Sequence, residues 1–256
     1  MVKLNFKIGV LVYLASLFPA CTPVLYIPNQ LNMPMATKPD VFKGSFYGGT
    51  GGLGGHASYA IDSHLVLFAN GCINNFVPKA SNQIYSYDAG GGYFGEIGEN
   101  LNIEILGGLG YGRSDANVSN NLAFRTFPTT EKDILHATYE RSFLQFDIVK
   151  THRNGNQFGF GVRLAEFSAG SFYYHRILTE NRTGYPPYVI EDSTLQTLNS
   201  GWLIEPEINF KAKLGAHSFF NTAFGFSVPT IHQNPYSSFS SVFSYFIFTI
   251  GLGFEI

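Results

Sequence analysis

The C-terminal stretch FIFTIGLGFEI, residues 246–256, alternates between two kinds of side chain. A period of two residues is typical of a β-strand whose two faces meet different environments. One face carries only large apolar side chains, which must contact lipid or a protein core, and the other is mostly small or polar. The apolar face comprises Phe246, Phe248, Ile250, Leu252, Phe254 and Ile256, and the opposite face Ile247, Thr249, Gly251, Gly253 and Glu255.

The same alternation extends back through the chain to residue 41 and predicts ten strands. Short connections rich in turn-forming residues alternate with longer ones. The expected strands are 41–49, 55–62, 64–75, 83–97, 100–114, 138–151, 157–172, 198–213, 217–228 and 243–256. The short connections are 62–64, 98–100, 153–156 and 214–217, and the longer ones are 76–82, 115–137, 173–197 and 229–242.

This regular exchange of short and long connections resembles that of small bacterial outer-membrane β-barrels, over residues 41–256. The resemblance implies an all-β fold, an antiparallel up-and-down transmembrane β-barrel of about 10 strands. It also implies tight periplasmic turns, long extracellular loops and both termini of the barrel on the periplasmic side. Members of this class often end in an aromatic residue that the insertion machinery reads, whereas this chain ends in Ile256.

Charged residues are scarce in this chain and aromatic residues are abundant. Asp, Glu, Lys and Arg make up 13% of the 256 residues, against about 25% in a typical soluble domain. Aromatic residues make up 16%, and their rings suit the headgroup layers of a membrane. The residues expected at these interfaces are Tyr85, Tyr87, Tyr111, Tyr139, Phe172, Tyr173, Tyr174 and Tyr245.

The apolar face of each strand can in principle point outward or inward. In a soluble lipocalin-like barrel it would line an internal ligand cavity, and the polar face would meet water. The polar face here mixes charged residues with many glycines, which suits the crowded interior of a small barrel better than a soluble surface. The sequence therefore favours a lipid-facing apolar surface, with the soluble barrel as the alternative.

Charged side chains on the polar face are expected to fill the lumen. A barrel of about eight strands is just wide enough for side chains to fill it, and ten strands add little room. Counting back from the 173–197 connection places Arg163 opposite Glu207, within about two residues. The expected lumen charges are Asp88, Glu96, Glu104, Arg141, Asp147, Arg163, Glu205, Glu207, Lys211 and Lys213.

The N-terminus carries the pattern of a bacterial export signal. Two lysines precede an apolar run over residues 8–18, which is too short to span a bilayer, and small residues follow it. We therefore expect residues 1–20 to be a signal peptide and the protein to be exported to the bacterial outer membrane. Cys21 resembles the acylated cysteine of bacterial lipoproteins, and the alternative is a chance cysteine beside an ordinary cleavage site.

The region after the cleavage point has no helical or alternating period. Residues 22–40 contain four prolines, which favours extended backbone. The expected organisation is therefore a signal peptide over 1–20, a lipid anchor and extended tether over 21–40, and an outer-membrane β-barrel over 41–256. If Cys21 is acylated, Cys72 is a free thiol, because the chain has only two cysteines.

Two glycine-rich stretches, at residues 49–54 and 90–95, match the G-x-G-x-x-G spacing of a dinucleotide site. No helical pattern follows either stretch, and glycines relieve crowding and permit curvature in a small barrel. The net charge of −2, with no basic stripe, argues against nucleic acid. The expected partner is outer-membrane lipid, with no nucleotide, no nucleic acid and no cofactor.

Some outer-membrane barrels are hydrolases or proteases, with a histidine and serine or acidic partners near the outer rim. The sequence does not fix the mutual geometry of such residues here, and the histidines of the short turns lack metal-ligand spacing. We therefore expect no enzyme. The rim candidates are His56, His136, His175 and His232, with Ser58, Asp115, Glu131, Glu180, Glu191 and Asp192, and the turn histidines are His64, His152 and His217.

The long connections 115–137 and 173–197 are the expected carriers of any extracellular function, because rigid scaffolds usually present function on such segments. The favoured interpretation is a lipid-anchored structural or surface-interaction protein with a polar, side-chain-filled lumen. A narrow solute channel and a soluble lipid-binding periplasmic lipoprotein are the alternatives.

Overall fold

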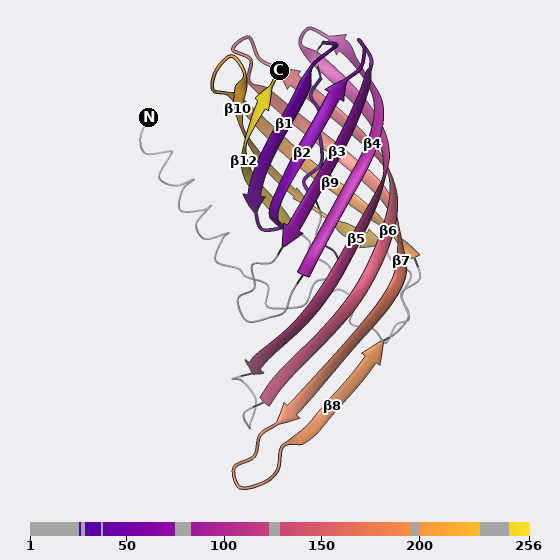
Figure 1. Ribbon diagram of the computed structural model, residues 1–256, viewed down its shortest axis with the longest axis vertical. Coiled ribbons are helices and arrows are strands. Elements are labelled where there is room, and N and C mark those ends of the chain that lie inside the picture. Colours follow the sequence, from indigo (N-terminus) through magenta and orange to yellow (C-terminus); the bar gives the residue numbers. More distant parts are fainter. Residues whose placement is uncertain are drawn as a thin grey trace.

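The chain folds as a closed antiparallel β-barrel (Figure 1). The computed structural model describes Tyr26 and residues 29–36, 38–74, 83–122, 129–195, 200–230 and 246–256. The barrel consists of β1 (Phe42–Gly49), β2 (Gly52–Ala60), β3 (Leu65–Asn74), β4 (Gln83–Gly98), β5 (Leu101–Leu122), β6 (Thr129–Thr151), β7 (Gln157–Glu180), β9 (Ser200–Lys213), β10 (Ser218–Phe226) and β12 (Phe246–Glu255). The prediction of ten barrel strands is therefore confirmed.

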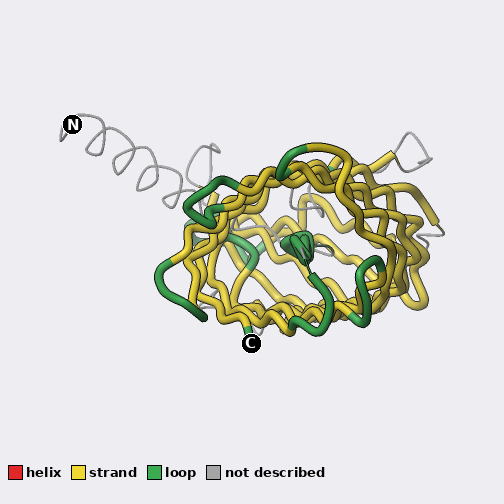
Figure 2. Tube along the Cα trace, turned by 90° about the horizontal axis from the view of Figure 1, so that it is seen from above, coloured by secondary structure: helices red, strands yellow, loops and turns green. Residues whose placement is uncertain are grey.

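Two pairings between strands that do not follow one another directly along the chain close the ring. β12 pairs with β1, so that the last strand lies beside the first, with Glu255 opposite Lys43. β9 pairs with β7 over Gln157 to Ser168 and bypasses the intervening strand. Seen from above, the strands surround a central space (Figure 2). Closure removes the free edges that lipid cannot satisfy with hydrogen bonds.

β5, β6 and β7 extend beyond the barrel rim as a projecting sheet (Figure 1). β4 pairs with β5 only as far as Asp115, whereas β5 and β6 stay paired out to Leu122 and Thr129. β7 then turns into β8 (Tyr188–Leu195), which pairs back along it. A short strand, β11 (Val228–Thr230), pairs with the start of β9.

The prediction of long loops over residues 115–137 and 173–197 is therefore wrong for most of their length, because strand pairing continues there. The predicted strands end where the alternation of apolar and polar residues fades. Outside lipid a strand no longer needs an apolar outer face, so hydrogen-bonded pairing persists without that signal.

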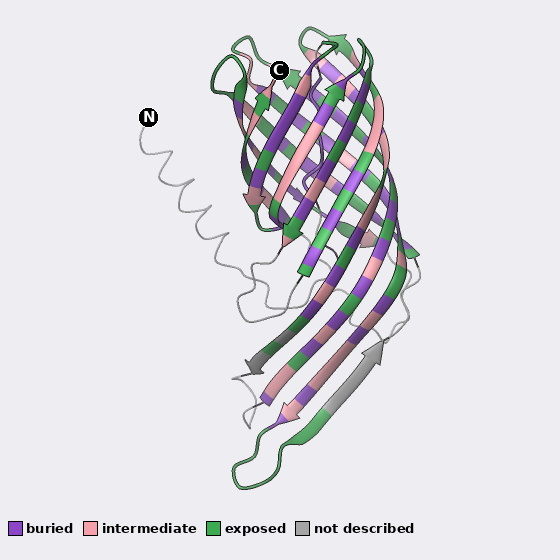
Figure 3. Ribbon diagram, in the orientation of Figure 1, coloured by how far each residue is buried: buried purple, intermediate pink, exposed green. Residues whose placement is uncertain are grey.

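Large apolar side chains cover the outside of the barrel. Burial alternates along the strands (Figure 3). In β12, Ile250 is 44% exposed and points outward, while its neighbour Thr249 is 1% exposed and points into the lumen. Such an arrangement is opposite to that of a soluble barrel and fits a lipid-facing wall. Other exposed apolar residues are Ile105, Leu109, Phe146, Ile148, Phe158, Phe160, Trp202, Ile208, Phe224 and Leu252.

The aromatic residues expected at the interfaces divide between the two faces. Tyr85, Tyr87 and Tyr111 form a cluster of neighbouring rings, with centroids 5.5 Å apart for Tyr87 and Tyr111, and both Tyr85 and Tyr87 are exposed. Tyr139 is buried inside, as are Phe172 and Tyr174 on the inner side of β7, so the prediction for these three is wrong. Tyr173 is half-buried, and Tyr245 lies outside the described residues.

Tight turns gather at the end of the barrel that also holds the start of β1 and the end of β12 (Figure 1). In one of them, the backbone N–H groups of His64 and Leu65 donate to Asp62 Oδ1 at 2.6 and 2.7 Å, and these bonds lower the pKa of Asp62. In another, Gly155 has a φ of 83°, a conformation that favours glycine. This end, hereafter the short-turn end, corresponds to the periplasmic side of an outer-membrane barrel.

A charge on the lipid face should oppose assembly. Ile250→Arg places a guanidinium near the middle of the apolar band and is expected to cost about 2–4 kcal/mol of folding free energy in lipid. The matched control is Leu214→Arg, because Leu214 is exposed at a turn of the short-turn end and should tolerate a charge. Folding into lipid vesicles, read from heat-modifiable gel migration, compares the two variants, and equal losses would show that the outer wall is not lipid-facing.

Candidate functional site

The barrel lumen is occupied by a piece of the chain's own N-terminal region. Tyr26 and residues 29–36, hereafter the plug segment, are buried and lie inside the ring of strands. Residues 29–36, part of the predicted tether, have no regular secondary structure, and their backbone turns, since Met33 N–H donates to Leu31 O at 3.1 Å and Met35 has a φ of 50°. The position of the plug segment inside the barrel is a feature that the sequence analysis missed, and the chain N-terminal to Tyr26 lies outside the described residues.

The plug segment runs along the lumen from the short-turn end to about the middle of the barrel. At its C-terminal side, Asp40 N–H donates to Ala60 O beside a tight turn of the short-turn end. At its N-terminal side, Tyr26 contacts Arg141 and Glu205, which lie near the middle of β6 and β9. The contacts between these points move in order along the wall, so the direction of the segment is defined.

Near the short-turn end, side chains of the wall bind the backbone of the plug segment. Lys43 Nζ donates to Met35 O at 2.6 Å, and Lys211 Nζ donates to Met33 O at 2.9 Å. Glu104 Oε1 accepts the backbone N–H of Ala36 at 2.9 Å. Charge-assisted bonds of this kind are stronger than bonds between neutral groups, so these lumen charges hold the segment in place.

The middle of the plug segment is bound from several directions. Glu207 Oε2 accepts the N–H of Leu31 at 3.0 Å. The Asn32 amide donates to the carbonyl oxygens of Ala57 and Ala69 on β2 and β3, and Gln145 on β6 donates to Asn32 O at 3.0 Å. The segment therefore replaces water as the hydrogen-bonding partner of the inner wall.

Tyr26 completes a closed circuit of buried polar groups, hereafter the charge circuit. Arg141 donates through Nε and Nη2 to both oxygens of Asp88, at 2.7 and 2.6 Å, and Arg163 Nε donates to Glu205 Oε2 at 2.6 Å. Arg163 Nη1 also lies 3.4 Å from Asp88 Oδ2. Tyr26 OH donates to Glu205 Oε1 at 2.5 Å and accepts from Arg141 Nη1. Two arginines and two carboxylates balance in charge, as buried ions require.

Aromatic rings surround the charge circuit on the long-loop side. The Tyr26 ring lies 5.5 Å from that of Tyr139 and 6.1 Å from that of Phe167, measured between centroids. Arg141 lies over the Tyr26 ring at 5.3 Å, and Arg163 over Phe143 at 5.2 Å. The apolar rings exclude water from the ion pairs, which strengthens each electrostatic contact.

Two of the predicted inward glycines make room for the plug segment. A Cβ atom added to Gly159 would lie 2.7 Å from Met35 Cε, and one added to Gly161 would lie 2.1 Å from Asp147 Oδ1 on the wall and 2.7 Å from Met33 Cε. These distances are shorter than van der Waals contact allows, so side chains here would push against the two methionines. Close packing against the plug segment, together with Asp147 at Gly161, thus explains why glycines stand at these two positions.

The structure brings most of the expected lumen charges inside. Arg163 pairs in register with Glu205, two residues from the expected partner Glu207 and within the stated margin. Glu96 and Lys213 are exposed at the short-turn end, so their placement in the lumen is wrong; Glu96 instead accepts the N–H of Asn100 at 3.2 Å. The buried charges are Asp88, Glu104, Arg141, Asp147, Arg163, Glu205 and Glu207, and Lys211 is half-buried.

One of the expected rim groups forms a pair. His136 Nδ1 lies 3.0 Å from Asp115 Oδ1, and Arg113 Nε donates to Asp115 Oδ2 at 2.5 Å. Burial raises the pKa of Asp115, but hydrogen bonds from His136 and Arg113 outweigh it and leave that pKa below its usual value. Ser58 lies on β2, with β3 and β4 between it and this pair.

The other rim candidates are dispersed. Glu131 lies 3.3 Å from Arg176, Glu180 pairs with Arg182, and Tyr173 OH lies 3.0 Å from His175 Nδ1. His56 lies edge-on to the Tyr47 ring inside the barrel. His232 and the side chains of residues 191 and 192 lie outside the described parts of the structure.

Within the described residues, no group of three or more histidines, cysteines, aspartates or glutamates is arranged to hold a metal ion. Cys72 is buried and free, and its Sγ donates to Gly51 O. The same part of the chain contains no helix that is both long and apolar enough to cross a bilayer.

Comparisons with known proteins give no family: no family model and no curated protein matches the chain. Among solved structures, the chain is similar to outer-membrane expressed OmpT of Vibrio cholerae, with 9% identity, a TM-score of 0.21, and coverage of 85% of this chain and 97% of that one. It is also similar to OmpT folded in vitro, an outer membrane protein of Vibrio cholerae, with 10% identity, a TM-score of 0.20 and the same coverage. The assignment of the fold rests on the strand pairing described above.

Breaking one partner of the charge circuit should cost more than removing an oppositely charged pair. Arg163→Gln leaves Glu205 buried without its arginine and is expected to destabilise the barrel by about 3–5 kcal/mol. The double variant with Glu205→Gln removes both charges and should lose less. Urea unfolding of the protein refolded in lipid vesicles gives the three free energies.

The exposed pair between Arg113 and Asp115 supplies the control, since Arg113→Gln should change the free energy of unfolding little. Equal losses for Arg163→Gln and the double variant would contradict the buried pairing.

Proposed function

We propose that this protein is a lipid-anchored outer-membrane β-barrel that does not conduct solutes and that presents a surface for interaction outside the cell. The outer-membrane-like barrel is its framework. The proposal includes a signal peptide over residues 1–20 and acylation of Cys21. Both are supported by the N-terminal sequence pattern. Outer-membrane lipid is the proposed partner of the wall.

The proposal that the lumen is closed rests on the hydrogen bonds of the plug segment. These bonds reach nine of the ten barrel strands, all except β10. A segment bound on all sides leaves no continuous polar passage for a solute. A narrow channel, the first alternative, would need a lumen whose charges face water.

The apolar outer wall argues against the second alternative, a soluble lipid-binding barrel. Side chains such as Phe146, Phe160 and Trp202 are about half exposed on the outside, at 46%, 45% and 55%. A soluble protein rarely exposes so large a continuous apolar surface. The interior, where a lipocalin-like protein would hold an apolar ligand, is occupied here by polar groups and the plug segment.

The projecting sheet supports a role in surface interaction. On its inner side, Arg176 Nε donates to Asp133 Oδ1 at 2.9 Å, and Tyr174 OH donates to the same oxygen at 3.0 Å. Burial is the main cause that raises the pKa of the Tyr174 hydroxyl, and the neighbouring Asp133 carboxylate raises it further. This network holds strands that lie outside the membrane, and rigid strands present a better defined surface than free loops.

Exposed aromatic residues lie at the tip of the projecting sheet. Tyr185 and Tyr188 are 75% and 59% exposed, and the Arg182 guanidinium lies 5.7 Å from the centre of the Tyr188 ring. Tyrosine and arginine are enriched at binding surfaces because they supply contact area together with hydrogen bonding. The tip of the β7–β8 hairpin is therefore the proposed contact surface.

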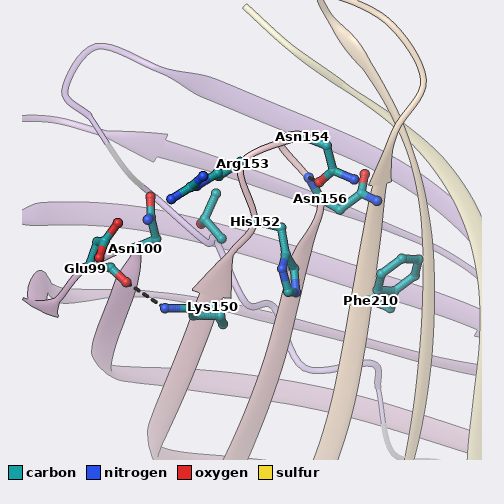
Figure 4. Close-up of a pocket in the computed structure, with 9 residues that line it drawn as sticks. Glu99, Asn100, Lys150, His152, Arg153, Asn154, Asn156 and Phe210 are labelled. Carbon is teal, nitrogen blue, oxygen red and sulfur yellow. Dashed lines mark hydrogen bonds between the residues drawn. The ribbon is translucent and has the colours of Figure 1, made fainter.

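A hollow at the short-turn end supports lipid as a partner of the wall. It has a volume of about 730 Å³ and lies between the turns that carry Asn100 and His152, with the outward Phe210 at its side (Figure 4). Lys150 Nζ donates to Glu99 O at 2.6 Å within it. Lys150 and Arg153 suit the phosphates of lipid headgroups at this boundary of the apolar wall.

Conductance measurements test the closed lumen. The purified wild-type protein should show no steady ohmic conductance of porin size in planar bilayers. Replacing residues 29–36 by a glycine–serine sequence of equal length removes the side chains and pairing of the plug segment and should open a conducting path. The control replaces the turn residues 181–187 in the same way and should remain silent.

Heat-modifiable gel migration must show that both replaced proteins still form barrels. Steady porin-sized conductance of the wild-type protein would refute the proposal, as would a silent variant with residues 29–36 replaced that still forms a barrel.

A further inference from the structure

We propose that the mouth of the lumen at the short-turn end is an anion site, which binds the phosphate group of a water-soluble molecule. The site is a cavity of about 290 Å³, hereafter the vestibule, with Lys38, Lys43, Lys211, Lys213 and Glu255 in its lining. Figure 2 looks onto this end of the barrel. The short-turn end is the periplasmic side of an outer-membrane barrel. The inference goes beyond the proposed function and does not depend on the lipid anchor.

Strand pairing brings the lysines together at this mouth. Lys211 and Lys213 share one face at the end of β9, and Lys43 stands at the start of β1, opposite Glu255 of β12. Lys38 follows the plug segment along the chain and supplies the fourth ammonium group. Glu255 is the only carboxylate among the residues that line the vestibule. Four lysines against one glutamate give its lining an excess of positive charge.

These ammonium groups have hydrogen-bond donors to spare. Lys38 and Lys213 are exposed, and neither ammonium has a hydrogen bond or an ion pair with another described residue. Lys43 Nζ and Lys211 Nζ each donate one bond to the plug segment, at 2.6 and 2.9 Å, and Lys43 Nζ also lies 3.5 Å from Glu255 Oε2. An ammonium group has three donors, so both of these lysines keep at least one for a ligand.

The positive charges of the vestibule repel one another. Lys43 lies close enough to Lys38 and to Lys211 for unfavourable electrostatic interaction with both. Glu104 attracts Lys43 and Lys211, and Asp147 attracts Lys211, but neither carboxylate lines the vestibule. Like charges held close together are unfavourable unless opposite charges offset them. An anion bound in the vestibule would offset the repulsion that remains.

The vestibule suits a phosphate group better than a carboxylate. A phosphate monoester carries a charge of about −1.5 to −2 at neutral pH and has three strong acceptor oxygens, so several ammonium groups can bind it at once. Planar carboxylates are best matched by the guanidinium fork of arginine, and no arginine is among the residues that line the vestibule.

The size and position of the vestibule favour a small, water-soluble ligand. Its volume of about 290 Å³ is close to the lower limit of ligand pockets, which fits a phosphate group with a small substituent. The cavity opens at the mouth of the lumen, inside the ring of strands, and not on the lipid-facing wall. A lipid head group would have to leave the membrane surface to reach it.

Titration with inorganic phosphate tests the inference. The protein is refolded in dodecyl maltoside, a detergent without phosphate, and binding at low salt is measured by isothermal titration calorimetry. Lys38→Gln with Lys213→Gln removes two exposed charges of the vestibule, and the matched control, Lys132→Gln with Arg182→Gln, removes two exposed charges of the projecting sheet. The wild type and the control should bind phosphate alike, and the vestibule variant about tenfold more weakly.

Competition identifies the kind of anion. Sodium acetate at equal ionic strength and short-chain phosphatidylglycerol in the micelles should each displace little phosphate from the wild type. Absence of phosphate binding by the wild type would overturn the inference, as would equal affinities of the vestibule variant and the control when heat-modifiable migration shows that both form the barrel. Equal competition by acetate would overturn the assignment to phosphate, and displacement by phosphatidylglycerol would overturn the assignment to a water-soluble ligand.

Discussion

The buried charges of the lumen and the backbone of the plug segment depend on each other for hydrogen bonds. Glu104 and Glu207 accept backbone N–H groups of the segment, and Lys43 and Lys211 donate to its carbonyl oxygens. An ion left unpaired in this space would cost several kcal/mol, and an extended segment without partners would be equally unfavourable. Filling the barrel with its own chain gives these four side chains backbone partners, while Glu104 Oε2 and Glu207 Oε1 are buried without a hydrogen bond among the described residues.

This mutual dependence has a consequence for assembly. The plug segment binds strands from both ends of the barrel sequence, among them β1 and β12, which meet at the seam. A segment joined to β1 at one end and bound on so many sides cannot be threaded into a finished ring at little cost. We therefore expect the ring to close around the segment.

The sequence predicted the barrel well because lipid imposes a strict pattern on the wall. Alternation in stretches such as residues 246–256 follows directly from the two environments of a strand, and each of the ten predicted strands overlaps one barrel strand. The projecting sheet was missed because polar strands outside lipid carry no such pattern. Glu96 and Lys213 share the parity of lumen residues but lie past the end of the apolar band, where parity no longer determines burial.

The plug segment could not be recognised from sequence for a different reason. Residues 29–36 have no period, and their partners are single side chains spread over nearly the whole wall. One signal was present: inward glycines at Gly159 and Gly161 leave space that some other part of the chain must fill. The four charged residues of the charge circuit were predicted to lie in the lumen. Its fifth group, Tyr26, was not, because it lies in the region that the sequence predicts to be a tether.

Amide hydrogen exchange over the plug segment, in the folded protein in lipid or detergent, tests the central claim most directly. The N–H groups of Leu31 and Ala36, bonded to buried carboxylates, are predicted to exchange as slowly as those of the barrel strands. Exchange of residues 29–36 at the rate of the exposed turn around Asn154, in a protein whose strands remain protected, would show that the segment does not occupy the lumen.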